Sequence, residues 1–183
     1  MAGKYPTAGE LTAIFDQFAS PIYQYVVRLC HDPAVGDTVV GDAFAQLLEE
    51  FIIGKGPPLD LRLYLYQTAH KFILKYLHDR QHYPVLPVVI TSGEITAISS
   101  PSRDDERTME EALFSALHNE ITEDQRYVMS LYFLEDFSIK DTAKILGKKV
   151  NEIGASLRDI QKVMDNHPEL PTESLTKKKR KPK

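Results

Sequence analysis

The chain has a single cysteine among its 183 residues, and this scarcity excludes several kinds of protein. One thiol, Cys30, can form neither an internal disulfide nor a cysteine-based zinc site. No apolar run approaches the roughly 20 residues that a membrane-spanning helix needs. The first residues, 1–10, also contain no apolar signal core. We therefore expect a cytoplasmic protein that is not inserted in a membrane.

Motifs for catalysis and for cofactor binding are missing as well. The sequence shows no alternation of strand and helix and no glycine-rich phosphate loop. No segment combines a nucleophile, a base and an orienting group, as nucleophilic catalysis requires. We therefore expect no enzymatic activity, no cofactor and no metal ion.

Positive charge is scarce except near the C-terminus. The chain has 22 lysines and arginines against 26 acidic residues, a net charge of −4. Residues 168–183 hold six of the basic residues and only two acidic ones, and we expect this segment to be a basic disordered tail. Any DNA binding by the folded parts must therefore be local and geometric, because the overall field is weak.

What the sequence does contain is helical periodicity, beginning in residues 1–83. Two prolines at first-turn positions predict helix restarts, which give the pieces Leu11–Phe18 and Pro21–Cys30 and then a helix from Pro33 to about Phe51. A further helix is predicted over residues 59–82, after a loop rich in glycine and proline. Apolar spacing assigns the following residues to the core: Val40, Phe44, Leu47, Phe51, Leu65, Ala69, Phe72 and Tyr76.

Residues 109–167 carry the most specific pattern. Thr122 with Gln125, and Ser138 with Asp141, have the spacing of helix-capping boxes. Gly147 marks a turn. A third helix then follows, with an apolar stripe at intervals of three and four residues: Val150, Ile153, Leu157, Ile160 and Met164. Two short capped helices, a turn and a third helix predict a helix-turn-helix, which most often binds in the DNA major groove.

The predicted fold class is therefore all-α, with two small helical domains joined by an extended linker. The helical domains are residues 1–83 and 109–167. Residues 84–108, with their prolines, serines and acidic residues, form the linker.

This organisation resembles the compact sigma factors of the sigma-70 family, of the extracytoplasmic-function (ECF) type. Residues 121–128 (ITEDQRYV) and 135–147 (EDFSIKDTAKILG) are similar to the region 4 patterns LTEDQREV and EGLSYKEIAEILG. Residues 36–44 (GDTVVGDAF) and 64–71 (YLYQTAHK) are similar to the region 2 patterns AEDLVQETF and WLYTIARN. The resemblance covers about residues 10–82 and 109–165.

The resemblance implies a function and three sets of site residues. Region 2 of such proteins binds the β′ coiled coil of core RNA polymerase and melts the −10 promoter element, whereas region 4 binds the β flap and reads the −35 element. It also implies an anti-sigma factor as a further partner. Core polymerase binding falls on Asp37, Thr38, Gly41, Asp42 and Gln46. The −10-like DNA contacts fall on Tyr64, Tyr66, His70, Lys71, Lys75 and His78. The −35-like DNA contacts fall on Lys148, Lys149, Asn151, Glu152, Ala155, Ser156 and Arg158.

Departures from the family pattern keep a second function open. The usual Lys-Ser-Arg of the recognition helix is replaced by Gly154, Ala155 and Ser156, and the usual capping serine falls on Lys149. We therefore expect Asn151 to cap a shortened helix. Because Arg158 and Lys162 balance Glu152 and Asp159, the alternative is a degenerate sigma-like protein that acts by protein–protein contact, such as a sigma mimic that binds an anti-sigma factor. The lysine face of residues 71–78 also has a simpler interpretation, a solvated surface beside core tyrosines.

Overall fold

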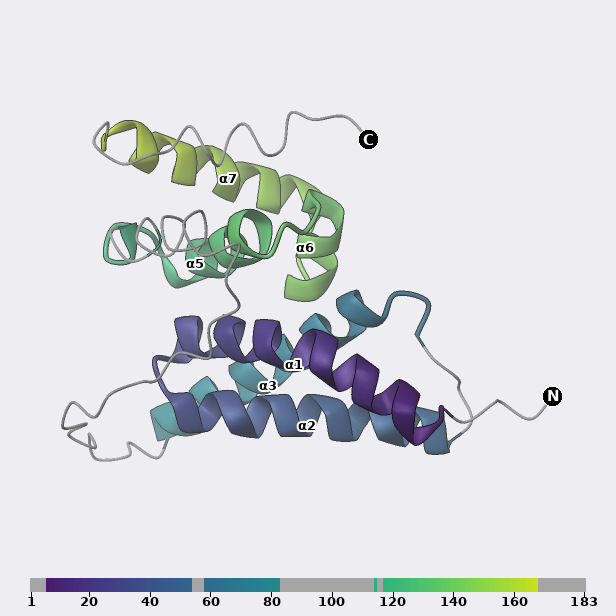
Figure 1. The fold of residues 1–183 in the computed structure, drawn as a ribbon. Coiled ribbons are helices and arrows are strands. Elements are labelled where there is room, and N and C mark those ends of the chain that lie inside the picture. Colours follow the sequence, from purple (N-terminus) through teal and green to yellow (C-terminus); the bar gives the residue numbers. More distant parts are fainter. Residues whose placement is uncertain (1–5, 54–57, 83–113, 115–116, 168–183) are drawn as a thin grey trace, which may run out of the picture. The chain divides into compact units, whose positions relative to one another are not determined.

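The computed structural model describes residues 6–53, 58–82, 114 and 117–167, and every regular element within these ranges is helical (Figure 1). This confirms the all-α prediction. The helices divide into two compact units, one containing α1 to α3 and the other containing α5, η1 and α7. The predicted linker, the tail and the exact domain boundaries lie outside the described residues. None of the described helices is long and apolar enough to cross a membrane.

The first helix, α1 (Ala8–Cys30), is continuous, so the predicted break before Pro21 is wrong. A proline inside a helix removes one backbone hydrogen bond and usually disrupts the helix. Here the turn after Pro21 is fixed by burial, because Ile22, Tyr25 and Val26 are completely inaccessible to solvent. Tertiary packing therefore outweighs the local signal for a restart.

The second helix, α2 (Pro33–Ile52), begins where the sequence predicted. Asp32 caps it, since its Oδ1 accepts a hydrogen bond from the Ala34 N–H at 3.0 Å, and Pro33 occupies the first position. Valines, Ala43, Leu47 and Phe51 bury one side of the helix. Gly36 lies directly against α1, since a Cβ atom there would stand 2.7 Å from the Tyr23 ring.

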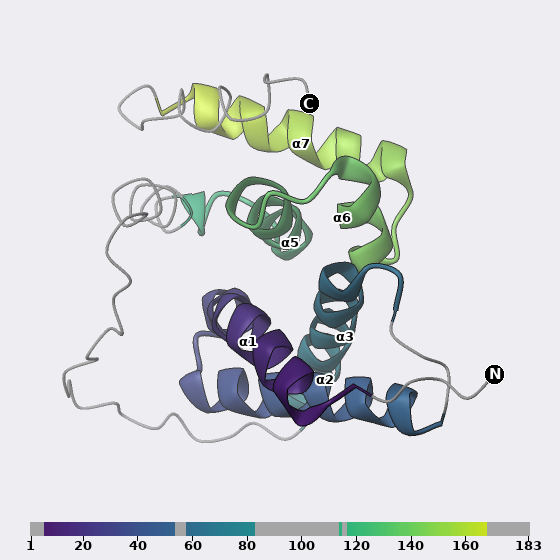
Figure 2. The ribbon, with the colours of Figure 1, turned by 45° about the vertical axis from the view of Figure 1, so that its right-hand side comes forward.

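The third helix, α3 (Leu61–His82), packs against both α1 and α2, as Figures 1 and 2 show. Leu65 and Ala69 are buried as predicted. Phe72 and Tyr76 are only half-buried. The other buried residues of this helix are Tyr66, Thr68, His70 and Ile73. The helix is therefore turned slightly from the orientation that the apolar spacing indicated.

The second unit begins with α5 (Glu123–Met129), which continues into a π-helical turn, η1 (Ser130–Leu134). The Thr122 capping box is confirmed, with the Gln125 N–H donating to Thr122 Oγ1 at 3.3 Å and the Thr122 N–H donating to Gln125 Oε1 at 2.8 Å. In η1 the Glu135 N–H donates to the Ser130 carbonyl at 2.9 Å, five residues earlier. This wider turn was not predicted, because no residue type marks it.

Two further helices, α6 (Ile139–Leu146) and α7 (Val150–Asp165), complete the predicted motif. Gly147 separates them and has a positive φ of 63°, a conformation that glycine adopts without strain. Ile153, Ile160 and Met164 of α7 are buried, Leu157 is half-buried and Val150 is exposed. The capped helix-turn-helix therefore forms as predicted, except that Val150 lies outside the core.

The cap of α6 gives a direct test of this local reasoning. Ser138 Oγ accepts a hydrogen bond from the Asp141 N–H at 3.1 Å and donates one to Asp141 Oδ2 at 2.7 Å. We expect Ser138→Ala to lower the free energy of unfolding by about 1 kcal/mol, because an N–H at the helix start loses its acceptor. Urea unfolding measures the change. The control is Ser20→Ala, an exposed position inside α1, which should stay within about 0.5 kcal/mol of wild type. Equal losses in the two variants would contradict the prediction.

Candidate nucleic-acid interface

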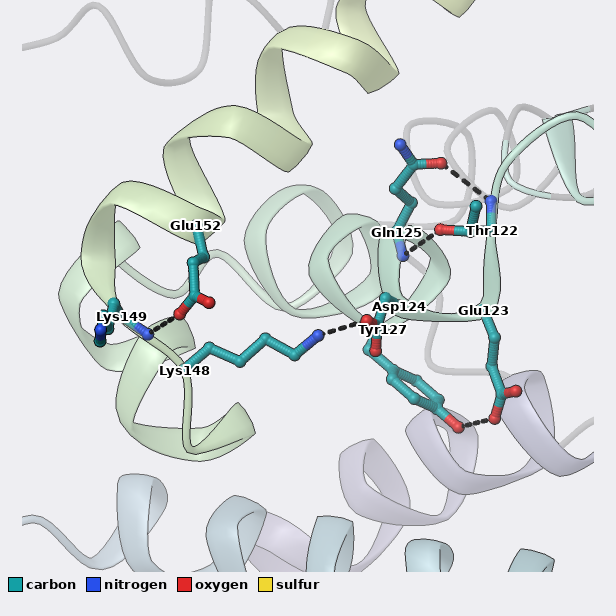
Figure 3. A network of polar contacts seen from close by, with 8 residues as sticks. All are labelled: Thr122, Glu123, Asp124, Gln125, Tyr127, Lys148, Lys149 and Glu152. Atoms are coloured by element: carbon teal, nitrogen blue, oxygen red, sulfur yellow. Dashed lines mark hydrogen bonds and ion pairs between the residues drawn. The ribbon is translucent and has the colours of Figure 1, made fainter.

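Lys148, the first basic side chain before α7, is already engaged within the protein (Figure 3). Its Nζ lies 2.5 Å from Asp124 Oδ2, on the first turn of α5. The Lys148 side chain is 31% exposed and the Asp124 side chain 63% exposed. A ligand that approaches the start of α7 therefore meets an ion pair, with the carboxylate more accessible than the ammonium.

Lys149 occupies the cap position of α7, and the helix begins at Val150 without shortening. The expectation that Asn151 would cap the helix is therefore wrong. Instead, the Lys149 N–H donates a 2.6 Å hydrogen bond to Glu152 Oε2, so that a carboxylate stabilises the positive end of the helix dipole (Figure 3). The side chains of Lys149, Asn151 and Glu152 are exposed, and all three remain accessible to a partner.

Farther along α7, the outward face has little net positive charge. Asp159 Oδ1 accepts a hydrogen bond from Lys162 Nζ at 2.9 Å, and this interaction holds the pKa of the Asp159 carboxyl below its usual value. Arg158 is exposed, with Nη1 3.8 Å from the position that a Cβ would take on Gly154. Ala155 and Ser156 are half-buried. Arg158 is thus the exposed cation in the middle of this face.

The predicted −10-like residues fall into two groups. Lys71, Lys75 and His78 are exposed along one side of α3. Tyr66 and His70, by contrast, are 1% and 4% exposed, so they do not form part of this exposed surface.

Their burial has a structural explanation in the core. The His70 Nδ1 lies 2.9 Å from the Tyr25 hydroxyl, and the Tyr66 ring centroid is 5.4 Å from that of Tyr25. Tyr64 is half-buried. The sequence placed Tyr66 and His70 correctly on α3 but on the wrong side of it.

The residues predicted to bind core polymerase gather on the solvent side of α2. Asp37, Thr38, Gly41 and Asp42 are exposed, and Gln46 is half-buried. Open space surrounds Gly41, since a Cβ there would meet no atom within 4 Å. These residues form one polar surface, which we call the α2 face.

Apolar side chains that the sequence did not single out extend this surface. Leu48 is 40% exposed and Ile52 is 67% exposed. They follow Gly41 by seven and eleven residues, which places them on the same side of a helix. Their helical spacing from Gly41 was the signal in the sequence that could have found them.

The described ranges contain no group of three or more histidine, cysteine or acidic side chains that could hold a metal ion. The candidate features within these ranges are three surfaces: the helix-turn-helix, the lysine face on α3 and the α2 face.

Comparison with known proteins shows what this chain is similar to. Residues 112–159 match the family model described as sigma-70, region 4. A comparison with curated protein sequences gives no significant match. Among solved structures, the chain is similar to the sigma factor RpoE in its complex with the anti-sigma factor NepR from Bartonella quintana. That similarity has a TM-score of 0.62 and 14% sequence identity, over 94% of this chain and 100% of the other.

A structure described as the RsbN–BldN complex is also similar, with a TM-score of 0.35 and 14% identity over 86% of this chain and 93% of the other. The fold is like that of the RpoE structure, and most of the helix-turn-helix lies in the segment that matches the sigma-70 region 4 model.

Proposed function

We propose that this protein is an alternative sigma factor, which binds core RNA polymerase and directs it to a specific set of promoters to initiate transcription. The observation that carries the proposal is the helix-turn-helix of residues 122–165, most of which lies in the matched region 4 segment of residues 112–159. Its caps and its turn are formed, and Ile153, Ile160 and Met164 are buried, so α7 has one side packed and the other turned outward. The first unit, with its exposed α2 face, supplies the surface proposed for polymerase.

The proposed division of labour follows the two units, with residues 1–83 as the region 2 domain and residues 109–167 as the region 4 domain. Arg158, Lys148 and Lys149 position upstream promoter DNA, with Asn151, Glu152, Ala155 and Ser156 along the same helix. Lys71, Lys75 and His78 contact the backbone of the melted downstream DNA, with Tyr64 beside them. The α2 face binds the β′ coiled coil, and region 4 also binds the β flap. The proposal places this activity in the cytoplasm.

Run-off transcription with purified core polymerase tests the proposal. The templates come from sequencing the RNA that core polymerase makes from the protein's own genome when this protein is added. We expect transcripts with shared start sites that disappear when the protein is left out. The absence of protein-dependent initiation at every salt concentration would refute the proposal.

The α2 face permits a separate test of polymerase binding. We expect Asp42→Lys to weaken binding to core polymerase about tenfold, because it reverses a charge in the centre of the proposed contact. Fluorescence titration of labelled protein with core polymerase measures the change. The control is Asp16→Lys, which makes the same charge reversal on the exposed side of α1. If both variants bind as wild type does, the α2 face is not the polymerase contact.

A second function is favoured by the charges around α7. Three carboxylates there already face cations or a backbone donor: Asp124 with Lys148, Glu152 with the Lys149 N–H, and Asp159 with Lys162. A region 4 domain with so few free cations suits a sigma mimic that binds an anti-sigma factor through protein–protein contact. Binding to core polymerase without initiation, together with capture of an anti-sigma factor, would favour this function. Salt-sensitive and sequence-selective DNA binding would count against it.

A further inference from the structure

Asp124 lies where a DNA phosphate would otherwise meet Lys148. Its Oδ2 is 2.5 Å from the ammonium nitrogen, so the two groups are in direct contact as an ion pair. A carboxylate and a phosphate offer the same chemistry to an ammonium group, namely a negatively charged oxygen. We propose that Asp124 is an internal competitor for DNA phosphate, which sets how strongly the start of α7 binds the DNA backbone. The inference rests on the proposed DNA-binding function and names a residue that lowers the affinity for DNA.

The competition follows from exposure and position. Asp124 is the more accessible member of the pair, so an approaching phosphate is repelled by the carboxylate before it reaches the lysine. To bind Lys148, the phosphate must first separate the ion pair. Asp124 also lies in the first turn of α5, where the helix dipole stabilises a negative charge. The carboxylate therefore interacts favourably with the start of its own helix as well as with the lysine.

Glu152 also competes with phosphate for a hydrogen-bond donor at the N-terminal end of α7. Its carboxylate accepts the Lys149 N–H, a backbone donor at a helix start that commonly binds phosphate (Figure 3). The Lys148 ammonium and the Lys149 backbone N–H thus both already contact carboxylates of the protein itself. Asp124 is the better residue to test, because Glu152 also caps α7 and its replacement would disturb the helix.

The experiment compares Asp124→Asn with Asp165→Asn in the full-length protein. Both substitutions remove one negative charge from the second unit and keep the side-chain size, but Asp165 lies in the last turn of α7, where it accepts a hydrogen bond from Gln161. The probe is a labelled 30-base-pair duplex of random sequence, which reports on phosphate contacts alone. Affinity is measured by fluorescence anisotropy between about 25 and 150 mM salt.

We expect Asp124→Asn to bind the duplex about two- to fivefold more tightly than Asp165→Asn does, which is the range for release of one exposed ion pair. The slope of log affinity against log salt should steepen by about 0.9, because one more phosphate is contacted. In the background of Lys148→Gln, the advantage of Asp124→Asn should disappear. Circular dichroism checks that the helices are unchanged in each variant. If the role of Asp124 is purely structural, the slope of log affinity against log salt should stay at its wild-type value.

The outcomes separate this inference from the proposed function. If the wild type binds DNA but the two aspartate variants bind equally, Asp124 does not compete with phosphate and the proposed function stands. An advantage of Asp124→Asn that persists with Lys148→Gln also overturns the inference. If neither the wild type nor any variant binds the duplex at the lowest salt, the inference and the DNA-reading role of region 4 both fail.

Discussion

Replacing Gly36 with alanine is expected to lower the free energy of unfolding by about 1–3 kcal/mol, because it adds a methyl group where α2 already touches α1. The new Cβ would stand 2.7 Å from the Tyr23 Cε2 atom and 2.7 Å from the Val27 Cγ2 atom. The valine is branched at Cβ and therefore has little rotamer freedom inside a helix. Relief of the overlap requires α1 and α2 to move apart, which loosens the packing around the buried residues of both helices.

The matched control is Gly41→Ala in the same helix. Gly41 is exposed, and a Cβ there meets nothing within 4 Å. Alanine should therefore raise the free energy of unfolding by up to about 1 kcal/mol through its better helix propensity. Urea unfolding of the two variants beside wild type measures both changes. Changes of the same sign would mean that the close approach of α1 and α2 at Gly36 does not hold in solution.

These two glycines also show what the sequence could and could not reveal. Both lie in one predicted helix, five residues apart, and residue type alone cannot tell which one is in contact with a neighbouring helix. The caps at Thr122 and Ser138 were predictable because their hydrogen bonds are made within three residues of the chain. The continuity of α1 through Pro21 was not predictable, because it depends on burial against helices that lie farther along the chain.

In the candidate site, too, some features followed from local sequence patterns and others depended on contacts between helices. The periodicity of α3 placed Lys71 and Lys75 on an exposed side, as the structure has them. It did not fix the rotation of the helix closely enough to keep Tyr66 and His70 out of the DNA surface, because their burial depends on Tyr25 of another helix.

At α7, the composition had already indicated a helix with little net charge. The sequence could not show that Asp124 pairs with Lys148, since 24 residues separate them and only the turn after α6 brings them together. Short-range sequence patterns were therefore enough to predict most helices and the residues at which they begin and end. Contacts between elements, which decide the site, required the structure.

Arg158→Ala is expected to weaken promoter binding by the polymerase that carries this protein, at a cost of about 1–3 kcal/mol if the guanidinium contacts a base edge. Lys148 and Lys162 each face a carboxylate of the protein, whereas Arg158 is exposed at the centre of the outward face of α7. Arg158→Ala therefore removes the positive charge on α7 that is most accessible to DNA. Titration of the assembled polymerase onto a promoter found by transcript sequencing measures the affinity, and run-off transcription measures its consequence.

The matched control is Lys162→Ala, which removes a positive charge from the same helix. Because the Lys162 ammonium already interacts with Asp159 at 2.9 Å, its loss should cost promoter binding much less. Both positions are exposed and alanine is a good helix former, so neither substitution should unfold α7. A uniform loss across all promoters after Arg158→Ala would show that the arginine binds phosphate, whereas a loss that depends on the −35 sequence would show that it reads a base. If promoter binding and transcription are unchanged, α7 is not the DNA reader, and the protein–protein function becomes the better account of this helix-turn-helix.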